Sequence, residues 1–511
     1  MLEELKSFWY SSSKMYSFNF FFWGLLSSFS LPNLYLLPLG IFGFYKFFKN
    51  IFNVTSYKQI FFYGSIFSFG YFLFGFHWII FPLLVEKSLI FFIPVVLLLF
   101  PLFLSLFLSL PILLIGIYKN SFFLRKNLIF ANTLIYSLLI FVFEYLRSIV
   151  WTGFPWNLFS HIWAFNNNFM IISKYIGVHG LSFLTIFWLI LISHLLIYKL
   201  YRFSFFVFLG FPAFLFIFGS TSVAKPLDQQ IQVRLVQPNI SQELKWKNEY
   251  KIQHLKKLIN LSLEKKSKFS HRIVVWPEVA ITEFLNENDQ LISFLKKSFE
   301  ENEVLISGGL RRENGEIFNT FYKIDSTGYS HFDKIKLVPF GEFMPFRSFF
   351  PFKTITHDSK DFSKGTKKRV LKISELDVFI EPSICYEGIF KNVNSDEINL
   401  IINITNDAWF GSTSGPYQHL VAARFRSLER GLPLLRVANS GISGAYDING
   451  KLLKSIDLNT DGFVDLNMNI GKNDSVFSKF GNIVILYLII FMLIVSLLFD
   501  FFIFKKRLLK N

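Results

Sequence analysis

The sequence predicts a polytopic α-helical membrane domain joined to a water-soluble α/β domain. Of the 511 residues, 52% are hydrophobic and only 17% are charged, whereas a soluble domain has about a quarter charged residues. Long apolar runs fill the first part of the chain and its end, and a polar stretch with alternating strand and helix patterns lies between them. This composition excludes disordered, collagen-like and coiled-coil proteins.

Eight apolar runs predict membrane-spanning helices, since a span needs about 20 apolar residues. Seven lie in a predicted membrane domain, residues 1–225, and the eighth lies in a C-terminal segment, residues 481–511. The third, fourth and sixth runs are long enough to tilt or to include a re-entrant stretch. In order, the runs are residues 16–31, 34–50, 59–84, 88–117, 127–148, 168–198, 203–223 and 483–504.

The positions of Lys and Arg predict the orientation of these spans, because basic residues near span ends favour the cytoplasm. Alternate loops and the tail are basic, and they contain Lys46, Lys49, Lys58, Lys119, Arg125, Lys126, Lys199, Arg202, Lys505, Lys506 and Arg507. We therefore expect both termini in the cytoplasm and residues 226–480 on the opposite side. No A-x-A-like cleavage site follows the first run, which favours a retained span. The net charge of +16 thus reflects topology and does not indicate nucleic-acid binding.

Residues 226–480 predict an α/β domain with a buried sheet, because several of the expected strands are apolar on both faces. Expected strands lie at 231–237, 272–278, 304–310, 319–324, 377–387, 400–407 and 434–439, and expected helices at 247–268, 291–302 and 415–431. The chain has a single Cys, which excludes an internal disulfide and any multi-Cys metal site.

Three residues that follow expected strands are candidates for chemistry. Cys385 ends an apolar strand before a turn, where a thiol can be exposed and activated. Glu278 follows another strand beside Trp276, where partial desolvation would make it a usable base. Lys334 or Lys336 could stabilise an oxyanion. Taken singly, Cys385 could also be a small buried side chain, Glu278 a solvated residue at a strand end, and either Lys a surface charge.

The order of these motifs resembles a known superfamily. Trp-Pro-Glu at 276–278, K-x-x-L-V-P-F-G-E from Lys334 and Cys-Tyr-Glu at 385–387 are similar to the Glu, Lys and Cys motifs of the nitrilase, or carbon–nitrogen hydrolase, superfamily. Together with the spans, the strings LRSIVWTGFPWN, KLVPFGEFMPF, SICYE and NDAWFGSTSGPYQHL resemble its membrane-embedded apolipoprotein N-acyltransferase family. The resemblance implies a nitrilase-like αββα sandwich for residues 226–480.

The resemblance also implies roles for individual residues. Cys385 corresponds to the nucleophile, Glu278 to the general base and Lys334 to the oxyanion-stabilising Lys. The family Lys stands eight residues before the Glu of P-F-G-E, as Lys334 does before Glu342, which favours Lys334 over Lys336. Supporting positions match Glu342, Tyr386, Glu387, Trp246 and Trp409. The departures, Lys336 where His is frequent and Phe332 where Tyr is frequent, lie outside the triad.

The implied function is the last acylation step of bacterial lipoprotein maturation at the inner membrane, with the catalytic domain in the periplasm. An acyl chain would pass from a phospholipid to Cys385 as a thioester, and then to the α-amino group of S-diacylglyceryl-cysteine in an apolipoprotein. Neither a metal nor an organic cofactor is expected, and the partners are these two substrates and membrane lipid. Two alternatives are a membrane-tethered amidase or nitrilase that releases the acyl group to water, and a transporter or receptor with a binding-only outer domain.

Two further features allow two interpretations each, and a third allows one. The aromatic stretch 339–352 suits either an arm that dips into the membrane interface or a buried loop. Glu144 and Arg147 could face lipid headgroups or pair with each other. His179 and His419 lack partners at metal-ligand spacing, so we interpret them as structural.

Overall fold

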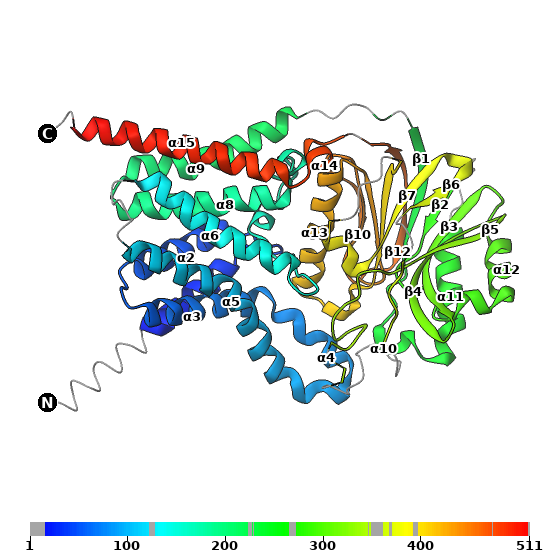
Figure 1. Ribbon diagram of the computed structural model, residues 1–511. Helices are drawn as coiled ribbons and strands as arrows, with labels where there is room; N and C mark the ends of the chain where they lie inside the picture. The colour runs from blue at the N-terminus through cyan, green and yellow to red at the C-terminus, as the bar shows by residue number, and fades with distance from the viewer. Residues whose placement is uncertain are drawn as a thin grey trace. The chain divides into compact units, whose positions relative to one another are not determined.

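The computed structural model describes residues 16–121, 128–222, 227, 229–264, 272–345, 347–348, 361–366, 370–391, 397–472 and 474–508. The chain forms two compact units (Figure 1). The helical unit comprises Met1–Ile80, Phe92–Ser222 and Phe480–Asn511, and the sheet unit comprises Phe81–Phe91 and Val223–Lys479.

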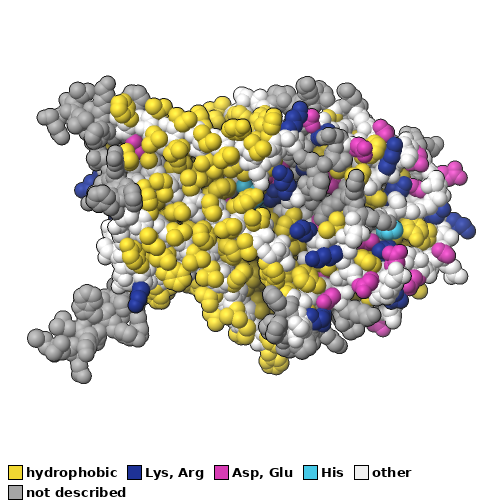
Figure 2. Space-filling view, in the orientation of Figure 1, with side chains coloured by type: hydrophobic (Ala, Val, Ile, Leu, Met, Phe, Trp, Pro, Cys, Tyr) yellow, Lys and Arg dark blue, Asp and Glu magenta, His cyan; other side chains and the backbone are white. Residues whose placement is uncertain are grey.

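The helical unit is built from long apolar helices and from short helical segments of four or five residues. They are residues 16–28, α2 (Leu37–Ile51), α3 (Tyr57–Gly75), η1 (His77–Ile80), α5 (Ile93–Asn120), α6 (Ile129–Ile149), η3 (Phe159–Trp163), α7 (Asn167–Met170), α8 (Ser173–Ile197), α9 (Tyr201–Thr221) and α15 (Ile483–Leu508). A proline occupies the first turn of α2 and of α5, where its missing N–H costs nothing. Hydrophobic side chains cover most of the visible face of this unit in Figure 2.

Among the described residues, five helices are long and apolar enough to cross a membrane, and a bent pair raises the number to six. The five are Ser88–Asn120, Ile129–Ile149, Ser173–Ile197, Tyr201–Thr221 and Ile483–Phe501. The bent pair, Tyr57–Gly75 and His77–Val85, turns by 63°. The predicted run 59–84 is therefore broken near Phe76. The run 168–198 also contains a break, because Gly177 adopts φ 72° within α8.

Buried charges in the helical unit hold turns in place. Glu144 and Arg147 are 4% exposed, so neither faces lipid headgroups. Glu144 accepts a hydrogen bond from the Phe159 N–H at 2.8 Å, and Arg147 donates to the carbonyls of Phe154 and Trp156 at 3.0 and 2.7 Å. The described residues include no direct ion pair between Glu144 and Arg147, but the two charges interact electrostatically. The two side chains satisfy the backbone of the turn after α6.

The last helix is tied to α6 by a buried carboxylate. Asp500 on α15 is 1% exposed, and it accepts hydrogen bonds from the N–H groups of Phe130 and Ala131 at 3.1 and 2.8 Å. These amides lie in the first turn of α6, where no intrahelical acceptor is available. Asp500 therefore caps a helix that is remote from it in sequence.

The sheet unit contains two six-stranded sheets, with strand orders β12-β1-β2-β3-β4-β5 and β11-β10-β9-β8-β7-β6. The pairs β1–β2, β2–β3, β7–β8 and β8–β9 are parallel, and the other neighbours are antiparallel. The strands are β1 (Gln229–Gln237), β2 (Arg272–Val275), β3 (Glu303–Glu313), β4 (Glu316–Asp325), β5 (Gly328–Asp333), β6 (Leu371–Ile373), β7 (Val378–Ile384), β8 (Leu400–Thr405), β9 (Leu434–Ala438), β10 (Ser443–Tyr446), β11 (Leu452–Ile456) and β12 (Gly462–Ile470).

Three apolar clusters arrange this unit as four layers. One cluster lies between the sheets and includes Val233, Ile306 and Ile402. A second joins the first sheet to its helices, and a third joins the second sheet to α13. The helices are α10 (Gln242–Lys245), α11 (Asn248–Leu263), α12 (Asp289–Ser298), α13 (Gly415–Arg430) and α14 (Val476–Phe480). Figure 1 shows α11 and α12 beside the first sheet and α13 beside the second, which is the predicted αββα arrangement.

A short segment from the first part of the chain also belongs to the sheet unit. It contains α4 (Phe81–Val85), which packs on η7 (Asp407–Phe410). Gly411 follows η7 with φ 60°, and a Cβ there would lie 2.3 Å from the Phe81 ring. Both the backbone conformation and the close approach of Phe81 therefore require glycine at position 411.

Candidate active site

The candidate residues lie where strands of the two facing sheets end. Glu278 follows β2, Lys334 follows β5 and Cys385 follows β7, at the start of η6 (Cys385–Ile389). The two sheets face each other across a common core, so these strand ends bring together residues that are far apart in sequence. All three side chains are buried, with exposed fractions of 6%, 1% and 8%.

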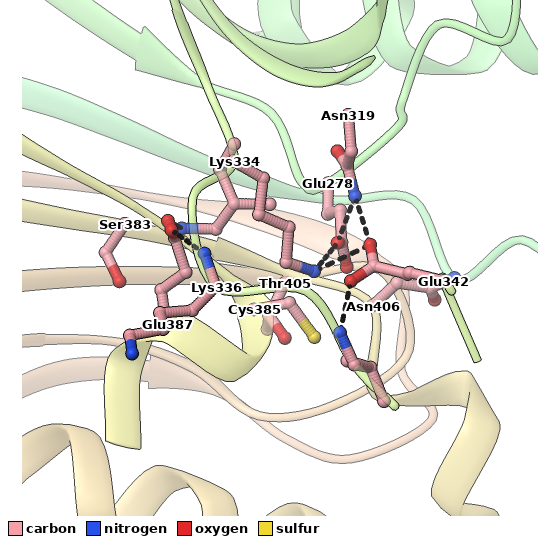
Figure 3. Close-up of polar contacts among 12 residues, drawn as sticks. Glu278, Asn319, Lys334, Lys336, Glu342, Ser383, Cys385, Glu387, Thr405 and Asn406 are labelled. Carbon is pink, nitrogen blue, oxygen red and sulfur yellow. Dashed lines mark hydrogen bonds and ion pairs between the residues drawn. The ribbon is translucent and has the colours of Figure 1, made fainter. Parts of the chain in front are cut away.

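Lys334 lies between two carboxylates (Figure 3). Its Nζ donates to Glu278 Oε1 at 3.1 Å and to Glu342 Oε1 at 2.9 Å. The Asn319 amide donates to the same two oxygens, at 2.8 and 3.0 Å, and the Val338 N–H donates to Glu342 Oε2 at 2.8 Å. The two carboxylates raise the pKa of Lys334 above its usual value, although burial opposes this. Lys334 is therefore a stable cation, and its hydrogen bonds orient the carboxylates of Glu278 and Glu342.

Cys385 begins the turn after β7 in a left-handed conformation, with φ 49°. A residue with a Cβ adopts this conformation only when the surroundings enforce it. Burial raises the pKa of the thiol to about 12, Glu278 adds to this effect, and Lys334 and a hydrogen bond with Thr405 oppose it. The thiol is therefore protonated at rest, and its attack on a carbonyl requires a base. Figure 3 shows the Cys385 side chain next to the group around Lys334.

Glu387 connects the loop that carries Lys334 to the turn that carries Cys385. Its Oε1 accepts from the N–H groups of Ile335 and Lys336 at 2.8 and 3.0 Å, and its Oε2 accepts from the Ile384 N–H at 3.0 Å. The side chain is fully buried. One carboxylate thus fixes the spacing between the two segments.

A buried polar network lies behind the nucleophile. His419 Nδ1 lies 2.8 Å from Asp407 Oδ1, and His419 Nε2 lies 3.1 Å from the Cys385 carbonyl oxygen. Arg436 donates to Asp407 Oδ2 at 2.8 Å and also to the Asn403 side chain. Burial opposes ionisation of Asp407, but Arg436 and His419 outweigh it and hold its pKa at about 2. His419 therefore has a structural role, because it links Asp407 to the backbone of the turn that begins at Cys385.

The remaining predicted residues lie around this centre. Lys336 is exposed, and its Nζ lies 5.3 Å above the Phe390 ring, away from both carboxylates. Tyr386 is buried, with its ring 4.9 Å from that of Phe390. Trp246 follows α10 and Trp409 lies in η7, and both are partly buried. Their roles at the active-site mouth remain predictions.

The aromatic stretch 339–352 is described only at 339–345 and 347–348. Phe340 is 51% exposed with φ 63°, and its N–H donates to the Phe343 carbonyl at 2.8 Å. Arg347 forms an ion pair with Asp361. The described part is therefore a tight turn with an exposed aromatic ring, and its insertion into a membrane remains a prediction.

Sequence reasoning did not select several residues that the fold brings to the site. Asn319 was placed only as the first residue of an expected strand, because an amide does not titrate, yet it contacts both carboxylates. Lys245 was also missed, although its Nζ donates to the Glu278 carbonyl at 3.1 Å. No local pattern marks Asn319, because β4 also contains Thr320, Lys323 and Asp325. Among the described residues, no group of three or more His, Cys, Asp or Glu side chains is placed to hold a metal ion.

Comparisons with known proteins agree with these motifs. The carbon-nitrogen hydrolase family matches residues 232–471, and the apolipoprotein N-acyltransferase N-terminal domain matches residues 23–191. The apolipoprotein N-acyltransferase of Rickettsia prowazekii is 33% identical over 474 residues, covering 86% of this chain and 90% of its own. The chain belongs to the apolipoprotein N-acyltransferase family.

Two further relatives place the chain among apolipoprotein N-acyltransferases. The Rickettsia typhi protein is 34% identical over 86% of this chain and 90% of its own, and the Brucella melitensis protein is 33% identical over 79% and 78%. The family assignment predicted from the motifs is thus confirmed. The helical unit and the sheet unit carry the two matched domains of this acyltransferase family.

Proposed function

We propose that this protein transfers an acyl chain from a phospholipid, through a thioester on Cys385, to the α-amino group of S-diacylglyceryl-cysteine in apolipoproteins. The observation that carries the proposal is the grouping of a buried thiol, a carboxylate base and a fixed ammonium in a chain that also has long apolar helices. Family membership supports the acceptor, because the relatives are named for apolipoprotein N-acylation.

The first half-reaction forms the acyl-enzyme. Glu278 accepts the thiol proton as the Cys385 sulfur attacks the ester carbonyl of the phospholipid. Lys334, with backbone N–H groups of the turn, stabilises the oxyanion of the tetrahedral intermediate. The carbon–oxygen bond of the ester then breaks, and the lysophospholipid alkoxide leaves with the proton held by Glu278. The high pKa of the resting thiol makes this base necessary.

The second half-reaction uses the same groups in reverse. The free α-amine of the diacylated cysteine attacks the thioester carbonyl, and Glu278 accepts its proton. The carbon–sulfur bond breaks, and the Cys385 thiolate is reprotonated by Glu278. Lys334 again stabilises the oxyanion. Hydrogen bonds with Glu342 and Asn319 hold Lys334 and Glu278 in position through both steps.

The proposal also assigns topology. Residues 1–225 form a membrane domain with seven spans, residues 226–480 a periplasmic catalytic domain, and residues 481–511 an eighth span with a cytoplasmic tail. The alternation of basic loops supports this orientation. Substrates anchored in the membrane require the reacting thiol to be within reach of the outer leaflet, which explains why a nitrilase-like domain would need spans.

The test is intact-protein mass spectrometry of the purified full-length chain after incubation with phospholipid. We expect a mass gain of one acyl chain that hydroxylamine removes and that Cys385→Ser lacks. A diacylated lipopeptide should then discharge the adduct and gain the acyl chain. Discharge by water alone would identify a membrane-tethered hydrolase, and a folded protein that never forms an adduct would leave a binding-only outer domain.

A further inference from the structure

We propose that Lys245 supplies a second positive charge to the active site and stabilises the negative charge that forms when Cys385 attacks. This inference rests on the proposed function above, because it assigns Lys245 a role in that reaction. Among the described residues, no hydrogen bond joins Lys245 to the thiol. It acts through its charge and through its contact with the segment that carries the base.

The position of Lys245 is fixed by the Glu278 turn. Lys245 is the last residue of α10, and its side chain is 4% exposed. Its Nζ donates to the Glu278 carbonyl oxygen at 3.1 Å. The residue whose carboxylate serves as the base therefore also anchors this second ammonium.

The ammonium of Lys245 has unused hydrogen-bonding capacity. A Lys ammonium has three N–H donors, and within the described ranges Lys245 Nζ makes this one hydrogen bond and no ion pair. A buried cation with one neutral partner is unfavourable unless nearby negative charge compensates it. The acidic groups that interact with it electrostatically are Glu278 and the Cys385 thiol, which becomes negative when it loses its proton. The charge of Lys245 is thus directed toward the reacting groups.

The charge balance of the site explains why a second cation is needed. Lys334 contacts both Glu278 and Glu342, so one positive charge faces two negative charges. When Glu278 takes the proton of Cys385, one negative charge moves to the sulfur and then to the acyl oxygen, and the excess negative charge stays buried. The ammonium of Lys245 brings this group to neutrality.

Other titratable groups near Lys245 do not remove its charge at neutral pH. Burial lowers the pKa of Lys245 to about 8, and Glu278 and Cys385 oppose this effect. His254, on α11, has its pKa lowered by burial, by Lys245 and by Lys257, so it is mostly neutral. Lys245 is therefore cationic under conditions in which membrane enzymes work.

The experiment separates charge from hydrogen bonding in the full-length protein. Cys385 is the single Cys of the chain, so the rate of iodoacetamide alkylation at about pH 7, followed by intact mass, reports its thiolate alone. Lys245 carries its charge at this pH. We expect Lys245→Gln to slow alkylation about tenfold, which corresponds to a thiol pKa higher by about one unit, and to slow formation of the acyl adduct about tenfold. Lys245→Arg, which keeps the charge, should remain close to wild type in both measurements.

Lys247→Gln is the matched control, because Lys247 is exposed two positions further along the chain. If Gln unfolds the protein, Lys245→Met, an uncharged side chain of similar length, provides the same comparison at equal thermal midpoint. Wild-type alkylation and acylation in a folded Gln or Met variant would overturn the inference. Absence of an acyl adduct in the wild type would instead defeat the proposed function, and the alkylation rates at about pH 7 would still decide whether the charge of Lys245 acts on the thiol.

Discussion

Glu278 affects the Cys385 thiol in two opposite ways. As a base it removes the proton when the sulfur attacks, but as a nearby negative charge it raises the pKa of the resting thiol. Burial is the larger cause of the raised pKa, and Lys334 opposes both effects. The two functions of Glu278 can therefore be separated by measuring reactivity and catalysis in one variant.

We expect Glu278→Gln to lower the thiol pKa while it nearly abolishes acyl transfer. Removal of the negative neighbour favours the thiolate, so the midpoint of iodoacetamide alkylation should move down by about one pH unit. Loss of the base should slow formation of the acyl adduct about 100- to 10,000-fold. An upward shift of the alkylation midpoint would show that Glu278 does not act on the thiol as a negative charge.

Lys334 and Lys336 form a natural matched pair for the oxyanion role. Lys334→Met should reduce acyl-adduct formation about 100- to 1,000-fold, because it removes the ammonium between the two carboxylates. Lys336→Met should stay within about twofold of wild type, since this side chain is exposed and contacts an aromatic ring. Single-turnover acylation, read by mass, checks both. Equal losses in the two variants would count against the assignment.

The spacing of motifs predicted Lys334 over Lys336, and the structure places only Lys334 between the carboxylates. Asn319, Asp407 and Lys245 could not be predicted in the same way. Their contacts depend on which strand ends meet across two sheets, and that pairing has no local signature in the sequence. An amide such as Asn319 or a second lysine such as Lys245 can be recognised as part of the site only when the folded structure is known.

At the level of elements, Glu387 joins the segment after β5 to the start of η6. We expect Glu387→Gln to cost about 1 to 3 kcal/mol of stability, because one of the three backbone N–H groups bound by Glu387, the buried Ile384 N–H, loses its acceptor. Acyl transfer should fall as well, since the spacing of Lys334 and Cys385 changes. Thermal unfolding of the purified protein checks the first effect. An unchanged midpoint would mean that these amides find other acceptors.

Asp500 makes a comparable connection between helices. Asp500→Ala should destabilise the protein by about 1 kcal/mol, the usual cost of losing a helix N-cap. Ser496→Ala on the same helix is the matched control, because the buried Ser496 hydroxyl has no hydrogen-bond partner within the described ranges. Thermal midpoints in one detergent compare the two. A larger loss in the Ser496 variant would contradict the capping role.

Apolar central strands were predicted well, and edge strands were not. β8 is buried along its length and coincides with an expected strand. β11 is exposed at four of its five positions, so its sequence lacks the apolar run that marks a central strand. β5 and β12 likewise mix polar and apolar residues. The sequence therefore predicted an α/β domain. It did not predict the less apolar strands β5, β11 and β12, because their positions depend on pairing between segments that are distant in sequence.

At the level of the whole molecule, hydropathy predicts eight spans, and the described residues contain five helices with the length and composition of a span, or six with the bent pair. The 15-residue α2 is short for a span of about 20 residues, and the first run is described only from residue 16. The run 59–84 is divided by a bend of 63°. Hydropathy averages over such breaks, because it records composition and not the direction of the chain.

The proposed orientation can be tested with cysteines introduced into a Cys385→Ser background. Ser56 lies in a predicted cytoplasmic loop and Asn166 in a predicted periplasmic loop, and both are exposed. We expect a membrane-impermeant maleimide to label Asn166→Cys in intact spheroplasts, and Ser56→Cys only after permeabilisation. The reverse pattern would invert the topology and place the catalytic domain in the cytoplasm.

The bond from Asp500 to α6 also affects the order of events on the ribosome. Phe130 and Asp500 are 370 positions apart, an interval that takes about 20 to 70 seconds to synthesise at about 5 to 20 residues per second. During this time the first turn of α6 lacks its final acceptor, and the bundle lacks its last helix. The C-terminal helix thus completes the assembly only after translation of the whole sheet unit, and a prematurely terminated chain would leave an open bundle for quality-control proteases.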